Sequence, residues 1–528
     1  MLPALLHQKV CVSGGGIAGL TAAYELCIRG HGVTLLEASD RFGGRIMTHR
    51  FPDGTYGELG AMRIPITHGC VSHYVDKFRV KKRTFVSQNA NSYLYLRGKR
   101  SRISGLADPM EYKFLRNQYN LDLYGQDYIL SNFSPLDSLD KLFEQVSIPL
   151  GRKELELMFK HFEIPPQLQP FEQASMGQVL RGQPVIHNGV SLSHEGFEYV
   201  GRANGILWFE QTSCLQWIIN ELALYEQQKY ELEGGMEKLC DAFIEQISER
   251  VQENTTKSLL IKNAPVYELR HKGGKVEVLW RSGERTSNEA FDYVICTAPA
   301  GATVRITFDP PMPAEQYEAL TNLTYASAGK TLIHCSERFW ELNDGIIGGG
   351  SYSDLPHQQC WYPSDNSKEA NGTRFKYGLI RDEAQAIDWT VNAVQKSKQP
   401  AVFTAAYMWG PNADRFAALQ NDDLQSMLIL SSVAKVHPNI RAYVKDVDVD
   451  VVHYAWNSQS SPGSGAFAFF APGEQSRYQK ALCDPHFRDF DGIPRLFFAG
   501  EHLAIAHAWI QSAVQTALSA VFHVVNSP

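Results

Sequence analysis

Residues 9–37 read KVCVSGGGIAGLTAAYELCIRGHGVTLLE, and this stretch decides the fold. It begins with an apolar run, passes through a glycine cluster into apolar residues at helical spacing, and ends in a second apolar run. This order predicts a buried strand, a glycine turn, a helix and a second strand. The chain therefore contains a βαβ unit, which indicates a mixed α/β fold.

The glycine turn has the spacing G-x-G-x-x-G. Gly14 serves the tight turn, Gly16 lets the backbone approach a pyrophosphate, and Gly19 lets the helix contact the strand. Glu37 ends the second strand, where a carboxylate accepts a hydrogen bond from a ribose 2′-hydroxyl and would repel a 2′-phosphate. The unit therefore predicts an adenosine dinucleotide such as FAD or NAD. An unliganded βαβ turn is the alternative.

The whole chain has the composition of an ordinary globular enzyme. Its 528 residues predict at least two domains. A net charge of −7 gives no basic excess for nucleic acid or an anionic membrane, so neither is an expected partner. The start MLPALLHQ is too short for a signal peptide, so the chain as written is expected to be cytoplasmic, although a trimmed precursor would look the same. The nine cysteines show no metal-binding spacing, so no metal site is expected.

Further patterns along the chain predict how the domains are divided. Residues 93–103 alternate around a Gly-Lys turn like a hairpin, and residues 137–230 are dominated by helical spacing. Between 258 and 297 the segments SLLI, APVYELRH, KVEVLW and FDYVICTAP predict strands. The strand LFFAG and a helix at 509–523 close the chain. This order predicts a dinucleotide domain interrupted by a second domain and a helical insertion.

The segment ASDRFGGR after Glu37 resembles the flavin-dependent amine oxidase superfamily, and in particular the FAD-dependent L-amino acid oxidases. The resemblance continues through EGGMEKL at 233–239, the strand with Val266, AGKTLIHCSERFW and LFFAGEHLAIAHAWIQSA, and covers nearly the whole chain. It implies an α/β fold with a Rossmann-like FAD-binding domain of the GR2 type, a mixed-sheet substrate domain and a helical insert. The implied boundaries are 1–75, 231–325 and 485–528 for the FAD-binding domain, 76–105 and 326–484 for the substrate domain, and 106–230 for the insert.

The same resemblance implies which residues hold FAD. Arg45 would pair with the pyrophosphate, Glu501 would hold the ribityl hydroxyls, and the helix beginning near Trp509 would direct its dipole at the flavin. Ala466 stands where some amine oxidases carry a cysteine bonded to FAD, so the cofactor is expected to be non-covalent. The full expected set is Gly14, Gly16, Ile17, Ala18, Gly19, Glu37, Ala38, Arg41, Gly44, Arg45, Gly60, Ala61, Met62, Arg63, Val266, Trp456, Gly500, Glu501, Ala508, Trp509 and Ile510.

Three further residues are implied in catalysis. Lys330 lies in an apolar strand, where a buried ammonium is costly unless it is paired, and by resemblance it would hold a water near flavin N5 and assist the reaction with dioxygen. A surface lysine at a strand start is the alternative. Phe467 and Trp509 match two aromatics that wall the substrate amine, although aromatics at strand spacing are more often plain core.

Arg63 in GELGAMRIP, residues 57–65, matches an arginine that grips the α-carboxylate in L-amino acid oxidases. A guanidinium gives two charge-assisted bonds to a carboxylate, which a lysine cannot do. Tyr407 in FTAAYMWG matches a tyrosine whose hydroxyl adds a third bond. The alternative for Arg63 is an ion pair with Glu58 or Asp76.

The resemblance implies oxidative deamination of L-amino acids to 2-oxo acids, ammonia and hydrogen peroxide, with dioxygen as acceptor. A homodimer or higher homo-oligomer is the expected assembly. The rival is an amino-acid 2-monooxygenase, and an amine or polyamine oxidase is disfavoured by Arg63. A carboxylate for a basic substrate has no better candidate than Glu210 or Asp137. No catalytic histidine is assigned, because His161, His187, His502 and His507 show no metal or base spacing.

Overall fold

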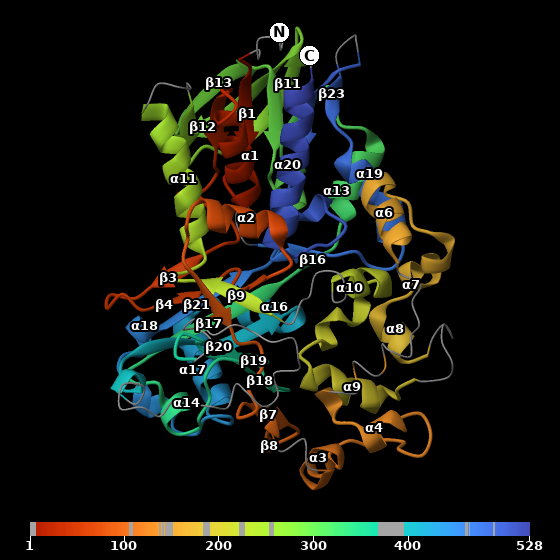
Figure 1. The fold of residues 1–528 in the computed structure, drawn as a ribbon, viewed down its shortest axis with the longest axis vertical. Helices are drawn as coiled ribbons and strands as arrows, with labels where there is room; N and C mark the ends of the chain where they lie inside the picture. Colours follow the sequence, from red (N-terminus) through yellow and green to blue (C-terminus); the bar gives the residue numbers. More distant parts are fainter. Residues whose placement is uncertain are drawn as a thin grey trace.

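The computed structural model describes residues 7–104, 109–136, 139, 142, 151–182, 191–220, 228–252, 258–367, 395–459, 463, 465–488 and 492–527. At its upper end in Figure 1 lies a six-stranded sheet that contains the βαβ unit. Its order is β10 (Leu259–Ile261), β2 (Gly32–Leu36), β1 (Lys9–Ser13), β14 (Tyr293–Cys296), β24 (Pro494–Phe498) and β23 (His486–Arg488). All neighbours pair in parallel except β23, which is antiparallel to β24.

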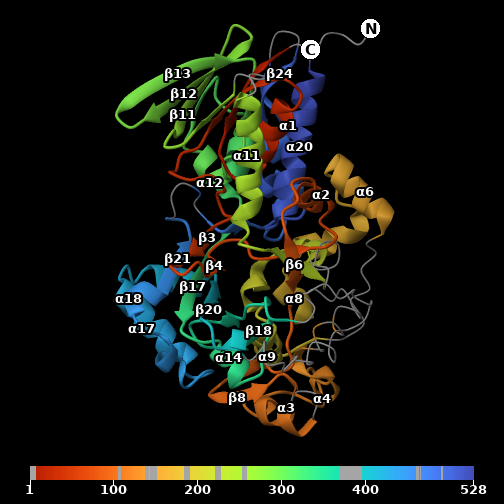
Figure 2. The ribbon, with the colours of Figure 1, turned by 60° about the vertical axis from the view of Figure 1, so that its left-hand side comes forward.

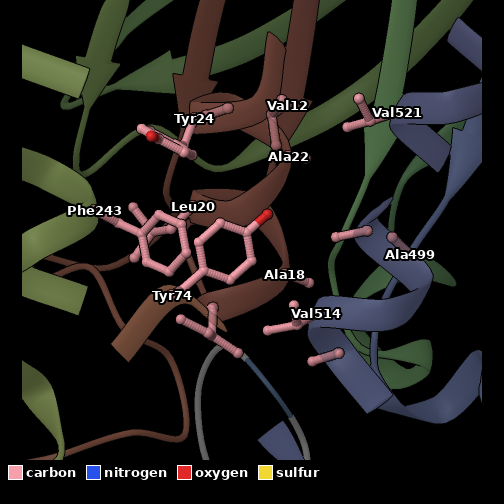
Figure 3. Close-up of a cluster of buried hydrophobic side chains, with 14 of the residues drawn as sticks. Val12, Ala18, Leu20, Ala22, Tyr24, Tyr74, Phe243, Ala499, Val514 and Val521 are labelled. Carbon is pink, nitrogen blue, oxygen red and sulfur yellow. The ribbon is translucent and has the colours of Figure 1, made fainter. Parts of the chain in front are cut away.

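Three helices pack together against this sheet and form the largest core of the molecule. They are α1 (Ile17–Cys27), α11 (Glu237–Gln252) and α20 (Ile510–Asn526). Tyr24 of α1 meets Phe243 of α11 with ring centroids 5.7 Å apart, and Figure 3 shows both in one cluster with Tyr74, Ala18 and Val514 of α20. Strands and helices from the first and last segments of the chain therefore share one core.

A four-stranded sheet extends from the six-stranded one, as Figure 2 shows. Its order is β13 (Arg285–Phe291), β12 (Lys275–Ser282), β11 (Val266–Lys272) and β15 (Thr307–Asp309). The turn between β11 and β12 lies at Gly273 and Gly274, both at positive φ. Strand β13 was not predicted, because its sequence RTSNEAF is polar and most of its side chains are exposed or half-buried.

A seven-stranded sheet forms the lower left part of Figure 1. Its order is β21 (Val451–Trp456), β17 (Ala328–Cys335), β20 (Ala401–Trp409), β19 (Gln359–Trp361), β18 (Gly350–Ser353), β7 (Tyr93–Leu96) and β8 (Lys99–Arg102). The predicted hairpin at 93–103 is the pair β7 and β8, so it joins strands that lie more than two hundred residues later in the chain. Helices α14 (Phe339–Leu342), α16 (Pro411–Ala417), α17 (Asp422–Val433) and α18 (Val447–Asp450) lie beside this sheet.

Small sheets connect the two large ones. They are β5 (Ile64–Pro65), β9 (Lys229–Leu232) and β6 (Lys82–Phe85); β3 (Thr48–Arg50) with β4 (Tyr56–Glu58); and β16 (Tyr325–Ala326) with β22 (Phe467–Ala468). The other α-helices that the structure describes outside the insert are α2 (Gly69–Lys77), α12 (Ala300–Thr303), α13 (Ala314–Asn322) and α19 (Glu474–Cys483).

The described part of the predicted insert is mainly helical, with turns and loops between the helices, and its last two residues, 229 and 230, lie in β9. It contains α3 (Pro109–Arg116), α4 (Ile129–Asn132), α6 (Arg152–His161), α7 (Gln169–Gln173), α8 (Met176–Leu180), α9 (His194–Ala203), α10 (Cys214–Ile218) and the 3-10 turn η3 (Leu207–Gln211). The segment LDKLFEQV at 139–146 belongs to the stretch with predicted helical spacing, and most of it falls outside the described residues. Among all the residues that the structure describes, no helix has both the length and the apolar character to cross a membrane. The predicted domain boundaries stay a prediction.

Candidate functional site

The turn between β1 and α1 keeps backbone exposed where a phosphate would bind. Gly14 has φ +114°, and a Cβ on Gly19 would lie 1.9 Å from the Gly14 carbonyl oxygen, so both positions require glycine. Helix α1 begins after Gly16, and no described side chain caps its first turn. The space beside Gly16 is open, since a Cβ there would come no nearer than 4.0 Å to Gly44 across the turn. The uncapped N–H groups of a helix start attract an anion, and this one can be approached closely.

Glu37 is buried directly after β2. Its carboxylate accepts hydrogen bonds from the backbone N–H of Gly15 at 2.6 Å and from the N–H and hydroxyl of Ser39 at 2.8 and 2.7 Å. The ASDRFGGR loop then returns to the same turn, because Gly43 N–H donates to the Gly15 carbonyl at 2.9 Å. The acid and the glycine turn are therefore fixed next to each other, as the dinucleotide interpretation requires.

The two arginines of the loop have different contacts. Arg41 donates to the carbonyl oxygens of Gly44 and Ile46, so it fixes the loop's shape. Arg45 Nη1 lies 2.6 Å from Glu501 Oε1 and also donates to the Ala466 carbonyl at 3.0 Å. The Arg45–Glu501 ion pair joins residues 456 apart in the sequence, and sequence patterns gave no signal for it.

Glu501 also accepts hydrogen bonds from the backbone N–H groups of Ala468 at 3.2 Å and Ala508 at 3.0 Å. Burial alone would raise the pKa of Glu501, but the Arg45 guanidinium holds the pKa below its ordinary value. The residue is therefore a carboxylate that ties the segments around Ala466, Glu501 and Ala508 together. Close by, α20 begins after Trp509, and its first turn likewise has no cap from a described side chain.

These features fit an adenine dinucleotide. Two helix starts offer uncapped N–H groups, and the acid after β2 lies at the position that reads a ribose. Val266 begins β11, and the neighbouring Ala264 N–H donates to the Glu37 carbonyl at 2.8 Å, so the strand that carries Val266 of the expected FAD set reaches the same place.

The GELGAMRIP stretch is held to the seven-stranded sheet through its backbone. Trp456 Nε1 of β21 donates to the Leu59 carbonyl at 2.9 Å, and Lys330 Nζ of β17 donates to the Gly60 carbonyl at 2.6 Å. A Cβ on Gly60 would lie 2.1 Å from the Arg45 carbonyl oxygen, so only glycine fits. The stretch therefore lies between the ASDRFGGR loop and the strands β17 and β21.

Lys330 is buried, with 3% of its surface exposed, so the alternative of a surface lysine is wrong. Its ammonium lies 4.7 Å from the ring centroid of Tyr407, its register partner on β20. Burial is the main cause that lowers the pKa of Lys330 to about 7; the Glu58 carboxylate opposes this shift and Arg63 adds to it. Lys330 is consequently a buried ammonium that loses its proton at lower pH than an exposed lysine.

Glu58 faces this lysine from β4, and sequence reasoning considered it only as a partner for Arg63. Its carboxyl accepts hydrogen bonds from Met236 N–H at 2.8 Å and from the Thr48 hydroxyl at 3.0 Å. Burial raises the pKa of Glu58, whereas these bonds and the charge of Lys330 oppose this shift. The other acid considered for Arg63, Asp76, lies 2.7 Å from Lys82 Nζ.

Arg63 lies over two aromatic rings. Its Cζ is 4.9 Å from the ring centroid of Trp361 and 5.8 Å from that of Phe85. Neither ring was expected at the site, because Phe85 and Trp361 come from short strands without a motif. Arg63 is half-buried and follows three residues after Gly60, whose carbonyl accepts from Lys330, and the charge of Arg63 lowers the pKa of Lys330.

A chain of half-buried aromatic rings continues from Tyr407. The ring centroids of Tyr407 and Trp409 lie 5.0 Å apart. The centroid of Phe209 in η3 lies 5.1 Å from that of Trp409 and 6.4 Å from that of Phe467. The insert therefore supplies a ring that sequence reasoning missed. Trp509 contacts His68 with centroids 5.0 Å apart, so Phe467 and Trp509 have different partners, and their pairing around a substrate stays a prediction.

The remaining candidates have other partners or lie elsewhere. Glu210 forms an ion pair with Arg181, and Asp137 and His187 fall outside the described residues. His161 is exposed, whereas burial lowers the pKa of both His502 and His507 to about 4. Within the described ranges, no group of three His, Cys, Asp or Glu side chains is placed to hold a metal ion.

Known proteins match this chain over nearly its whole length. A family model described as flavin containing amine oxidoreductase matches residues 17–525. The L-amino-acid oxidase of Vipera ammodytes ammodytes is 28% identical over 519 residues, which cover 97% of this chain and 92% of that protein. The L-amino acid oxidase of Bothrops pictus is 28% identical over 518 residues, covering 97% and 89%.

Two solved structures share the fold. A variant of putrescine oxidase superposes with a TM-score of 0.66 at 18% identity and covers 98% of both chains. Cyclohexylamine oxidase from Brevibacterium oxydans superposes with a TM-score of 0.64 at 17% identity and covers 98% of this chain and 99% of that one.

Proposed function

The chain belongs to the flavin containing amine oxidoreductase family, and on this premise we propose that it is an FAD-dependent L-amino acid oxidase. The observation that carries the proposal is the Arg63 guanidinium, which lies over Trp361 and whose charge lowers the pKa of Lys330, the lysine that donates to the Gly60 carbonyl. A fork of N–H donors at that place suits an α-carboxylate, which a simple amine lacks. The names of the Vipera and Bothrops relatives support the same substrate class.

The bound flavin would supply the hydride acceptor and the reductant of dioxygen. The chain's own residues bind, orient and desolvate the substrate. Arg63 would hold the carboxylate and the Tyr407 hydroxyl would add a bond to it. The rings of Trp409, Phe209 and Phe467 would exclude water from the reacting carbon. Lys330 would present a proton on Nζ where negative charge develops on dioxygen.

The proposed cofactor set combines the residues predicted from sequence with the contacts of the structure. The uncapped starts of α1 and α20 would face the pyrophosphate and the flavin, and Glu37 would bind the adenosine ribose. Arg45 would act together with Glu501, its ion-pair partner. The homodimer also remains a prediction, which sedimentation of the purified protein would test.

The direct test of the proposed function is to offer the purified yellow protein the twenty L-amino acids. Release of hydrogen peroxide with a 2-oxo acid as product supports the oxidase. An amide of one carbon fewer would instead identify the amino-acid 2-monooxygenase. Turnover of amines without turnover of any amino acid would identify an amine oxidase and contradict the role of Arg63.

We expect FAD to be tightly bound without a covalent bond. Ala466 occupies the position of the attachment cysteine in some amine oxidases, and all nine cysteines are free thiols. Acid precipitation should therefore leave the flavin in the supernatant, where its absorbance is measured. Yellow colour that stays with the precipitated protein after washing would contradict this expectation.

Glu58→Gln should change the pH dependence of the dioxygen reaction. The Glu58 carboxylate raises the pKa of Lys330, whereas burial and Arg63 lower it, so its removal moves the pKa of Lys330 further down. We expect kcat/KM for dioxygen to fall as pH rises, and in the variant to fall at lower pH than in the wild type. Glu289→Gln, which alters a surface ion pair with Lys9, is the control. A profile identical to the wild type would mean that Glu58 does not set the charge of Lys330.

A further inference from the structure

We propose that Trp361 and Phe85 form an aromatic shelf that positions the Arg63 guanidinium for the substrate carboxylate. The two ring centroids lie 5.8 Å apart at an interplanar angle of 36°, and Arg63 Cζ lies 4.9 and 5.8 Å from them. The proposal rests on the proposed function, because it assigns these rings to the same carboxylate site. Trp361 and Phe85 are positioning residues, since they act through Arg63.

The shelf is rigid because Trp361 is fixed on several sides. Its indole Nε1 donates to Gln359 Oε1 at 2.9 Å, and only 5% of its surface is exposed. Gly350, its register partner on β18, lies against the ring, since a Cβ there would come within 3.2 Å of the indole. Tyr352 packs edge-on with its centroid 6.1 Å away. The ring therefore cannot turn away from Arg63 without moving β18.

Phe85 and Arg63 are held together by a separate sheet. Phe85 ends β6 and pairs with Lys229 of β9, and Lys229 also pairs with Pro65 of β5. Arg63 directly precedes β5. The shelf consequently joins the seven-stranded sheet, through Trp361, to the three-stranded sheet that carries Phe85 and the Arg63 segment.

A shelf of this kind explains why an arginine is suited to position 63. A guanidinium is planar, so one face can lie on aromatic rings while the N–H groups at its edge stay available for a carboxylate. Holding a long side chain in one place before the substrate arrives reduces the entropy lost on binding. The rings therefore contribute to the preference for an amino acid over the corresponding amine without touching the substrate.

Trp361→Leu should lower kcat/KM for an L-amino acid roughly 3- to 30-fold, the range of a cation–π contact. The matched amine without a carboxylate should be almost unaffected. Trp361→Phe should retain most of the preference, because it keeps a ring. Trp340→Leu is the control for loss of a buried indole. The Trp340 ring packs on Phe403, which lies in the same seven-stranded sheet as Trp361. A double variant with Arg63→Met should show no further loss from Trp361→Leu.

Binding of benzoate provides a readout that does not depend on turnover. Its Kd, measured by fluorescence titration, should rise by a similar factor in Trp361→Leu and stay unchanged in Trp340→Leu. Suppose that Arg63→Met removes the preference for amino acids, whereas Trp361→Leu leaves both this preference and the Kd of benzoate unchanged. The positioning role of the aromatic shelf is then contradicted, and the proposed function is retained. If the wild type has no preference for amino acids, the proposed function itself fails. If Trp361→Leu does not fold, Phe85→Leu replaces it as the variant that loses a ring of the shelf. Trp361→Phe is then the variant that keeps both rings and should retain most of the preference.

Discussion

Arg63→Met should lower kcat/KM for an L-amino acid by about 3 to 5 kcal/mol, the scale for breaking a desolvated charge pair. The substrate carboxylate would then face methionine carbon and the rings of Trp361 and Phe85 without a counter-charge. Amines without a carboxylate should feel little of this loss. The measurement is the ratio of kcat/KM for an amino acid to that for its decarboxylated amine, in wild type and variant.

Two further variants make the Arg63 result specific. Arg63→Lys should restore only part of the ratio, because one ammonium cannot hold the plane of a carboxylate or lie flat on the rings. Arg281→Met removes another arginine over an aromatic ring, that of Tyr267 at 5.6 Å, and should leave the ratio as in the wild type. An unchanged ratio in Arg63→Met, at full flavin content, would make Arg63 a structural residue and remove the main support for an amino-acid substrate.

The parts of the fold that follow from local sequence were predicted. The βαβ unit needs only short-range patterns: glycines that alone fit the turn, an apolar helix, and an acid after the second strand. The seven-stranded sheet could be predicted only as separate strands. Its pairing of β7 with β18 depends on packing between segments far apart in the chain, and a single sequence does not encode that pairing in any local pattern.

The site divides in the same way. Lys330 was predicted because a cation in an apolar strand is unusual, and the structure confirms that it is buried. The contacts that affect the charge of Lys330 could not be predicted from local patterns. Glu58 lies 272 residues earlier in the chain and Gly60 lies 270 residues earlier. The ring of Phe209 was missed for a related reason: a phenylalanine in a short 3-10 turn looks like ordinary core until the turn meets Trp409.

Lys330→Met should slow the reaction with dioxygen about 10²-fold, the scale of one lost electrostatic donor, while kcat/KM for the amino acid changes little. The reason is that a buried ammonium stabilises negative charge strongly where water cannot, and Lys330 is 3% exposed with its Nζ fixed at 2.6 Å from the Gly60 carbonyl oxygen. The measurement is kcat/KM for dioxygen with saturating amino acid, beside anaerobic rapid-mixing rates for the substrate.

The pH dependence separates a charge effect from a structural one. The pKa of Lys330 is lowered to about 7, so its protonated form is present below that pH and is lost as pH rises through it. The wild-type dioxygen reaction should therefore slow across neutral pH, whereas Lys330→Met should be slow at every pH and lack this transition. Lys229→Met is the matched control, because Lys229 is also 3% exposed and lies in the three-stranded sheet. It should leave the dioxygen reaction and its pH profile unchanged, although it removes an equally buried ammonium. Equal slowing of the amino-acid and dioxygen reactions in Lys330→Met, with the pH transition retained, would show that Lys330 supports the fold of the site and that another group assists dioxygen.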